Sequence, residues 1–325
     1  MQPVLARAGM CDTNRMPLSS SDRIAAVIVT HKRRDLLANS LHIVASQTLA
    51  PEWVVVVDNG NEPEVEDLVE SVCANSPTSP TPVYLPSRHN LGGAGGFAYG
   101  FLTALALGAD AIFCADDDGR PENTEVLATL MRVADKHGLE EVSPVVAGIE
   151  NPDQLAFPVR LPGTVEWKRK RSELEGTDNG TFIPGIASLF NGALFSANAV
   201  DQLGVPDLRL FIRGDEVEYN RRLNRSGLPY GTTLEAAYLH PTGADEFKPI
   251  FFGKMHTQYP DNENKRYFTY RNRGYLMNQP GMRKLKPQEY ARFAWFFLIQ
   301  RKDPKGFFSW LRLHRQGRHE RFTRP

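Results

Sequence analysis

Two acidic groups could hold a cation or move a proton. Asp116, Asp117 and Asp118 follow a short apolar run and precede Gly119. Three adjacent carboxylates repel one another unless a cation compensates their charge, and carboxylate oxygens are ligands for divalent ions, so the triplet predicts a metal site. The alternative is the acidic first turn of a helix that begins at Asp118.

The second acidic group is the pair Asp215 and Glu216, which follows an apolar run and begins a stretch with helical periodicity. A carboxylate crowded by another has a raised pKa, which suits a general base that takes a proton from a substrate hydroxyl. The pair could instead complement the dipole of a helix N-terminus. His240 is a further candidate metal ligand, because imidazole beside carboxylates suits ions such as Mn²⁺; the alternative is a structural histidine.

A glycine-rich segment runs from Arg88 to Phe97 and joins a predicted strand to a predicted helix. Free backbone N–H groups and the helix dipole at such a turn favour a diphosphate. The segment also matches GxGxxA at Gly93, Gly95 and Ala98, which leaves an NAD(P)-dependent dehydrogenase as an alternative. That fingerprint normally follows the first strand of a domain, whereas two strand–helix units precede it here.

The hydrophobic pattern predicts an α/β scaffold for these groups. Continuous apolar runs predict buried strands, and helical periodicity lies between them. The alternation predicts a mostly parallel sheet flanked by helices, with ligands at the carboxyl ends of the strands. The predicted strands are 24–30, 53–57, 83–85 and 111–115, the helices are 33–46, 62–73 and the segment ending at Leu107, and the polar residues at the strand ends are Thr30, His31, Asp58, Asn59, Arg88, His89, Asn90 and Asp116 to Asp118.

The periodicity weakens after Gly138, where we predict an irregular region. Within it, an apolar segment at 186–195 bends at Asn191 and Gly192. Further on, a strand at 208–212 is predicted to lead into the second acidic pair, and a strand at 236–239 to end at His240.

The C-terminal part is basic and aromatic. From Met282 to Pro325 there are 12 Lys or Arg against 3 Asp or Glu, whereas the preceding residues hold 26 against 35. From Asn264 onward we predict three helical segments, separated by Pro280 and Pro304. Aromatic and basic residues interleaved on helices favour contact with an anionic membrane surface over nucleic acid, which we do not expect as a partner. A helical lid on the core is the remaining alternative.

Composition excludes several classes of protein. With 325 residues, 41% hydrophobic and 23% charged, the chain is typical of a globular protein. Three cysteines without a CxxC pair predict no disulfide framework and a reducing compartment. No apolar run is long enough to span a bilayer, and the first twenty residues lack the apolar core of a signal peptide, so we expect a cytosolic protein.

With these residues in view, the sequence resembles the inverting family-2 glycosyltransferases, which have the Rossmann-like GT-A fold. The likeness covers about residues 24–273. The whole chain, including 184–195 and the aromatic tail, looks like the actinobacterial galactofuranosyltransferases that begin the galactan of arabinogalactan. The family's marks stand in order at 29–33, 57–59, 88–96, 116–118, 215–216 and His240.

The resemblance implies a role for each marked residue. Asp116, Asp118 and His240 would hold a divalent metal, Mn²⁺ or Mg²⁺. The family usually has Glu-Asp at the base position and uses the second residue, so Glu216 takes the role by alignment while Asp215 competes for it. Asn191, Gly192 and Arg213 are our candidates for the acceptor site. The nucleotide-sugar site would comprise Thr30, His31, Arg33, Asp58, Asn59, Arg88, Asn90, Gly93, Asp116 and Asp117.

The resemblance also implies substrates and a location. The donor would be UDP-galactofuranose and the acceptor a polyprenyl diphosphate carrying GlcNAc and rhamnose, met by a peripheral enzyme at the cytoplasmic face of the plasma membrane. A transferase for another nucleotide sugar, such as a rhamnosyltransferase with a dTDP donor, and a non-catalytic nucleotide-sugar-binding protein are alternatives. We expect a flexible segment at 1–22, a GT-A catalytic domain at 23–262 and a helical membrane- and acceptor-associated region at 263–325. A homo-oligomer is compatible with the sequence.

Overall fold

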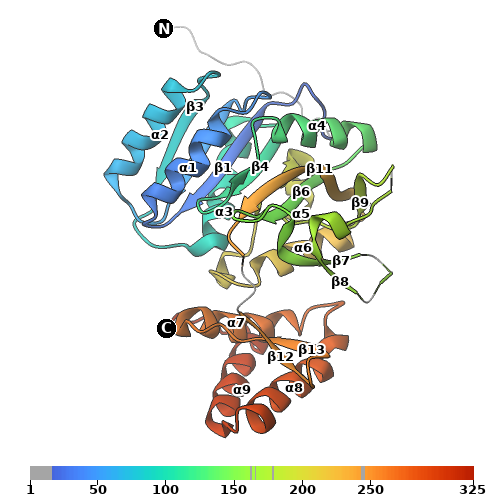
Figure 1. Cartoon of the computed structure of the whole chain (residues 1–325). Helices are drawn as coiled ribbons and strands as arrows, with labels where there is room; N and C mark the ends of the chain where they lie inside the picture. Colours follow the sequence, from blue (N-terminus) through green and yellow to red (C-terminus); the bar gives the residue numbers. More distant parts are fainter. Residues whose placement is uncertain (1–16, 162, 165, 178, 243–245) are drawn as a thin grey trace.

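A central mixed sheet organises the protein (Figure 1). The computed structural model describes residues 17–161, 163–164, 166–177, 179–242 and 246–325. The main strand order is β3-β2-β1-β4-β10-β6-β11-β5, with β7, β8 and β9 attached beside it. The strands are β1 Ile24–Thr30, β2 Trp53–Asp58, β3 Thr81–Pro86, β4 Ala111–Asp116, β5 Arg120–Pro121, β6 Glu141–Gly148, β7 Gln154–Arg160, β8 Trp167–Lys170, β9 Phe182–Pro184, β10 Leu194–Ser196 and β11 Tyr230–His240, and a separate hairpin contains β12 Phe247–Ile250 and β13 Met255–Gln258.

Helices cover both faces of the sheet, as its buried strands require. In β1, Ile24, Ala26 and Ile28 face the core under α1, α2 and α4, whereas Ala25 and Val27 face the core under α3, α5 and α6. The α-helices are α1 Arg34–Ala45, α2 Pro63–Asn75, α3 Gly92–Leu107, α4 Val126–His137, α5 Ala197–Leu203, α6 Asp215–Ser226, α7 Glu263–Leu276, α8 Lys286–Ala294 and α9 Pro304–Arg318, and the shorter helical turns are η1 Arg171–Glu173, η2 Leu208–Leu210, η4 Arg283–Leu285 and η5 Trp295–Gln300.

The first four long strands run parallel, which confirms the predicted α/β class. β1 pairs with β2 and β4, and β2 pairs with β3. In this register Thr30 lies opposite Asp58, and Val29 lies opposite Asp116. The carboxyl ends of these strands therefore meet at one edge of the sheet, as expected for a ligand site.

The predicted irregular region after Gly138 contains a buried central strand, β6. Pro144 and the buried polar residues Glu141 and Ser143 interrupt its apolar pattern, although tertiary pairing with β10 and β11 holds it in place. The alternative of a helix beginning at Asp118 is wrong, because α4 begins at Val126 and the short β5 pairs with β11 instead.

The strand predicted at 208–212 is also wrong. Residues Leu208–Leu210 form the 3₁₀ turn η2, and Phe211 and Arg213 have left-handed backbones with φ of 67° and 68°. Each such non-glycine residue costs on the order of 1 kcal/mol, so contacts from elsewhere must stabilise this loop. Those contacts come from α7, as shown below.

The C-terminal helices confirm the three predicted segments and pack around their own aromatic core, below the sheet in Figure 1. Tyr270, Phe293, Phe297 and Trp310 are buried there, and Ile250 of the β12–β13 hairpin joins them. No helix among the described residues is long and apolar enough to span a bilayer. At the other end, most of the predicted flexible segment lies outside the described residues, and Leu18 is buried against the main core.

Candidate active site

The edge of the sheet positions the acidic triplet through a small polar network. The Thr30 hydroxyl donates to Asp117 Oδ2 at 2.8 Å, and Arg33 Nε donates to the same oxygen at 3.0 Å. A second guanidinium nitrogen of Arg33 lies 2.6 Å from Asp118 Oδ2. Asp117 is almost wholly buried, so this network fixes its carboxylate at the end of β4.

The structure brings Asp116, Asp118 and His240 together, with one ligand atom from each lying within 4.8 Å of the others. His240 Nδ1 lies 2.7 Å from the carbonyl oxygen of Pro241, and it donates there if it carries the ring proton. Nε2 then presents its lone pair toward Asp118 Oδ1, at 3.4 Å. This buried oxygen has no hydrogen-bond donor among the described residues.

The electrostatics of this cluster fit a divalent cation. Burial raises the pKa of Asp116 well above its ordinary value, and the charges of Asp118 and Asp117 raise it further, whereas Arg33 lowers it. Two carboxylates and an imidazole are oxygen and nitrogen ligands of the kind that Mn²⁺ accepts, and the unpartnered oxygen of Asp118 lacks the positive partner that a cation supplies.

Tyr238 is a site residue that the sequence analysis missed. Its hydroxyl accepts a hydrogen bond from the backbone N–H of Asp116 at 2.9 Å and lies 3.1 Å from the carbonyl oxygen of the same residue. Tyr238 and His240 lie two positions apart on β11, so they share one side of the strand. That spacing was the signal that could have identified it.

Asp58 and Asn59, at the end of β2, are buried, and their side chains form hydrogen bonds with backbone groups. Buried Asp58 accepts hydrogen bonds from the N–H groups of Gly60 and Glu62 and from the hydroxyl of Tyr84, a second missed residue. Asn59 accepts from the N–H of Leu91 and donates to the carbonyl of Gly92. Its amide therefore ties β2 to the glycine-rich turn. His31 and Arg88 are exposed near the same edge.

The glycine-rich segment runs into the first turn of α3, and the prediction that its N–H groups are free is wrong at three positions, the first being Leu91, whose N–H donates to Asn59. Asn90 accepts from the N–H of Gly92, and the N–H of Ala94 donates to the carbonyl oxygen of Phe211. A Cβ on Gly92 would lie 2.2 Å from that oxygen, so close packing requires glycine there. A Cβ on Gly93 would lie 3.8 Å from Asp215 Oδ2, which places the turn beside the second acidic pair.

The second acidic pair begins α6, and burial changes its acidity. Burial raises the pKa of Asp215 to about 6, although backbone N–H groups and the positive charge of Arg213 oppose this. Burial and then the charge of Asp215 raise the pKa of Glu216 to about 7. The N–H of Leu189 opposes that shift. A carboxyl group with a pKa near neutrality is suited to general base catalysis.

Two of the acceptor candidates, Asn191 and Gly192, are neighbours in the chain, and the third, Arg213, lies in the loop before α6. Gly192 is left-handed, and a Cβ on it would lie 2.6 Å from the ring of Tyr238, so the backbone packs directly on that ring. Asn191 is buried, and its Oδ1 has no hydrogen-bond donor among the described residues. Arg213 forms an ion pair with Glu246 at 2.6 Å. Their role toward an acceptor stays a prediction.

The fold defines the class of the protein. Two solved structures resemble it: GalNAc-T7 with UDP, GalNAc and Mn²⁺ (TM-score 0.51, 14% identity, 68% of this chain and 44% of that chain) and TarS of S. aureus (TM-score 0.52, 12% identity, 87% and 44%). At these identities the likeness shows the fold alone. The mostly parallel sheet flanked by helices is that of the GT-A fold, as predicted.

Comparison of sequences then gives the family. Residues 25–196 match the model of glycosyl transferase family 2. The chain is 59% identical over 311 residues to the galactofuranosyltransferase GlfT1 of Mycolicibacterium smegmatis, covering 94% of this chain and all of that one. It is 56% identical over 308 residues to GlfT1 of Mycobacterium tuberculosis H37Rv, covering 94% and 98%. The chain therefore belongs to glycosyl transferase family 2 and is a glycosyltransferase, which excludes the dehydrogenase alternative.

Proposed function

We propose that this enzyme transfers galactofuranose from UDP-galactofuranose to a polyprenyl-diphosphate-linked acceptor carrying GlcNAc and rhamnose. The observation that carries the proposal is the likeness to galactofuranosyltransferases at 56–59% identity over 94% of the chain. Because the likeness extends beyond the family-2 region to 94% of the chain, it supports transfer of the same sugar, galactofuranose.

Glu216 is the proposed general base. It would accept the proton of the acceptor hydroxyl while that oxygen attacks the anomeric carbon and the bond from this carbon to the UDP oxygen breaks on the opposite face. One displacement inverts the anomeric configuration and needs no covalent enzyme intermediate. The raised pKa of about 7 allows Glu216 to be ionised at neutral pH and still basic enough to take the proton.

Asp116, Asp118 and His240 would hold the divalent cation, which we propose to be Mn²⁺ or Mg²⁺. When bound, such an ion supplies positive charge that stabilises the negative charge on departing UDP. Arg33 and Thr30 fix the neighbouring carboxylate of Asp117, so that the edge of the sheet is organised before the donor arrives.

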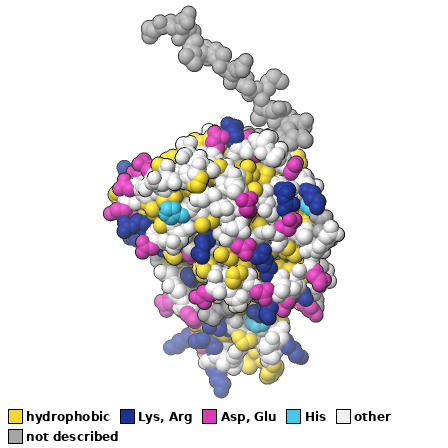
Figure 2. Space-filling view, turned by 45° about the horizontal axis from the view of Figure 1, so that its top comes forward, with side chains coloured by type: hydrophobic (Ala, Val, Ile, Leu, Met, Phe, Trp, Pro, Cys, Tyr) yellow, Lys and Arg dark blue, Asp and Glu magenta, His cyan; other side chains and the backbone are white. Residues whose placement is uncertain are grey.

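Because the proposed acceptor carries a lipid tail, the reaction would take place at a membrane surface. The C-terminal region has exposed apolar and basic side chains of the kind that bind such a surface. Phe252, Ile299 and Phe308 are 93%, 58% and 67% exposed. Figure 2 shows basic side chains around apolar ones at this end of the molecule. A hollow of about 500 Å³ beside α9 is lined by Leu311, Arg312, Arg315, Gln316, His319 and Arg321. We propose that this region contacts the anionic cytoplasmic face of the plasma membrane.

The test is a transfer assay with the purified full chain, Mn²⁺ or Mg²⁺, UDP-galactofuranose and a synthetic lipid-diphosphate-GlcNAc-rhamnose acceptor. We expect the acceptor to gain hexose mass, with EDTA abolishing the gain. UDP binding without product would contradict the proposed donor–acceptor pair. Product formation with another nucleotide sugar, such as a dTDP-rhamnose donor, would replace it.

A further inference from the structure

The loop that precedes the second acidic pair has an unusual backbone. Phe211, Arg213 and Gly214 all have positive φ, at 67°, 68° and 89°. Two of these residues are not glycine, so their left-handed conformation is intrinsically unfavourable. Asp215 follows directly at the start of α6, and the direction in which this helix begins depends on the loop.

Asn272 on α7 holds this loop by its backbone. Its side-chain nitrogen lies 2.8 Å from the carbonyl oxygen of Leu210, 3.0 Å from that of Ile212 and 2.6 Å from that of Arg213. Asn272 is fully buried. The two hydrogens of this amide are therefore shared among three carbonyl groups of the loop, of which that of Leu210 also accepts from Arg271 and from the N–H of Ile212.

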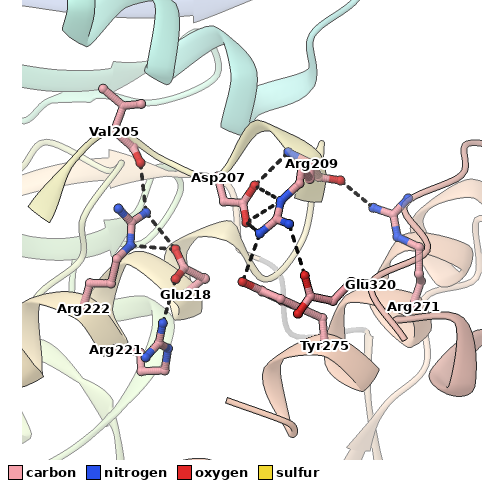
Figure 3. Close-up of polar contacts among 9 residues, drawn as sticks. All are labelled: Val205, Asp207, Arg209, Glu218, Arg221, Arg222, Arg271, Tyr275 and Glu320. Atoms are coloured by element: carbon pink, nitrogen blue, oxygen red, sulfur yellow. Dashed lines mark hydrogen bonds and ion pairs between the residues drawn. The ribbon is translucent and has the colours of Figure 1, made fainter. Parts of the chain in front are cut away.

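Arg271 orients the side chain of Asn272 and adds further hydrogen bonds to the same loop. Its Nε donates to the side-chain oxygen of Asn272 at 2.9 Å, which orients the amide nitrogen toward the loop. Another guanidinium nitrogen of Arg271 reaches the carbonyl oxygens of Arg209 and Leu210 at 3.1 and 3.0 Å. Figure 3 shows Arg271 meeting Arg209, whose own guanidinium is bound by Asp207.

The other side of the loop contacts the glycine-rich turn at the start of α3. The carbonyl oxygen of Phe211 accepts from the N–H of Ala94, and Gly93 packs beside Asp215. The body of α6 is fixed separately, because Arg222 binds Glu218 and the carbonyl of Val205 (Figure 3). The loop lies between the glycine-rich turn and α7. The position of α7 therefore determines where the Asp215–Glu216 pair lies relative to the glycine-rich turn.

We propose that Asn272, oriented by Arg271, is a positioning residue for the Asp215–Glu216 pair. This inference rests on the proposed function of the pair as the site of the base. Asn272 does not touch the reacting groups and acts through the three carbonyl groups of the loop. Helix α7 of the C-terminal region thus holds the loop that leads into the proposed base, in addition to any contact of this region with a membrane.

The test compares Asn272→Ala with Asn278→Ala in the full chain. Asn278 lies just beyond α7 and contacts Arg318 and Lys286, not the loop, so it serves as the matched control. We expect Asn272→Ala to lower kcat about 10- to 100-fold, as misplacement of a reacting group does, with KM for the donor and the affinity for UDP with Mn²⁺ unchanged. Asn272→Ser, which retains one donor, should recover part of kcat.

Hydrogen exchange gives a readout that does not depend on the substrates. The amides of residues 211–218 should exchange faster in Asn272→Ala than in Asn278→Ala, while those of β1 and β4 stay protected. Unchanged kcat together with unchanged exchange would overturn the positioning role, and so would an equal loss of UDP affinity and kcat. Failure of the wild-type chain to transfer from UDP-galactofuranose would contradict the proposed function alone, because the exchange comparison still decides the role of Asn272.

Discussion

The two acidic clusters contain the same chemical groups in different surroundings. At the sheet edge, Asp116 and Asp118 face an imidazole nitrogen of His240, and Arg33 binds the second carboxylate oxygen of Asp118. Burial is the largest cause of a raised pKa in both clusters, at Asp116 as well as at Asp215 and Glu216, so the two clusters differ in the groups beside them. Neighbouring groups decide the role of a carboxylate, and we propose on that ground that one cluster holds a cation and the other takes a proton.

The largest effect is expected for Glu216→Gln, which keeps the size of the side chain and removes its basicity. Transfer should fall by about 10²- to 10⁴-fold, the usual contribution of a general base. Product formation under saturating donor and acceptor measures this. Near-wild-type transfer by Glu216→Gln would assign the proton transfer to Asp215 or to no residue of the pair.

Asp118→Asn should have the next largest effect, because it weakens the site formed with Asp116 and His240. Transfer should fall by about 10²-fold, and more Mn²⁺ should be required to restore it. Asp110→Asn is the matched control, since Asp110 is a surface residue paired with Arg23. A variant whose metal requirement equals that of Asp110→Asn would show that Asp118 holds no cation.

The pH dependence sharpens the comparison at the acidic pair. Glu216 must be ionised to act, so kcat should rise with pH through about 7 and fall below it. The charge of Asp215 contributes to that raised pKa, so Asp215→Asn should move the rising limb to lower pH and retain activity. A pH–rate profile of the variant checks this. Loss of transfer at every pH would make Asp215 the base.

The smallest effect on chemistry is expected at the exposed aromatic side chains of the C-terminal region. Phe252→Ser with Phe308→Ser should weaken binding to anionic liposomes several-fold, because two apolar side chains no longer enter the interface. Affinity for UDP and transfer to a soluble acceptor should not change. Trp167→Ser, also at an exposed aromatic residue but on β8, is the control. If the double variant and Trp167→Ser bind liposomes equally well, the proposed membrane contact of the C-terminal region is wrong.

The sequence predicted the first half of the fold well because each strand there is a continuous apolar run between amphipathic helices. Parallel pairing then places Thr30, Asp58 and Asp116 at one edge without further information. The acidic triplet and the acidic pair were predicted as site residues from residue type, from their position after an apolar run and from the family resemblance. In the structure the glycine-rich turn lies next to the Asp215–Glu216 pair, since Gly93 lies beside Asp215.

The rest depended on contacts between distant residues. The segment 208–212 has the composition of a strand, yet Asn272, some sixty residues later, binds the carbonyl groups of Leu210 and Ile212. Arg271 binds that of Arg209, and the N–H of Ala94 binds that of Phe211. β6 was missed because Glu141 and Pro144 break its pattern. The hydrogen bond from Tyr84 to Asp58 joins distant residues and is encoded by no local pattern, whereas Tyr238 could have been found from its spacing to His240.

Calorimetric titration of UDP in the presence of Mn²⁺ tests the division of roles most directly, with wild type, Glu216→Gln and Asp118→Asn side by side. We expect Glu216→Gln, although impaired in transfer, to bind UDP as tightly as wild type, whereas Asp118→Asn loses the part of UDP affinity that depends on Mn²⁺. Equal weakening of UDP binding in both variants, or weakening in Glu216→Gln alone, would contradict that division of roles.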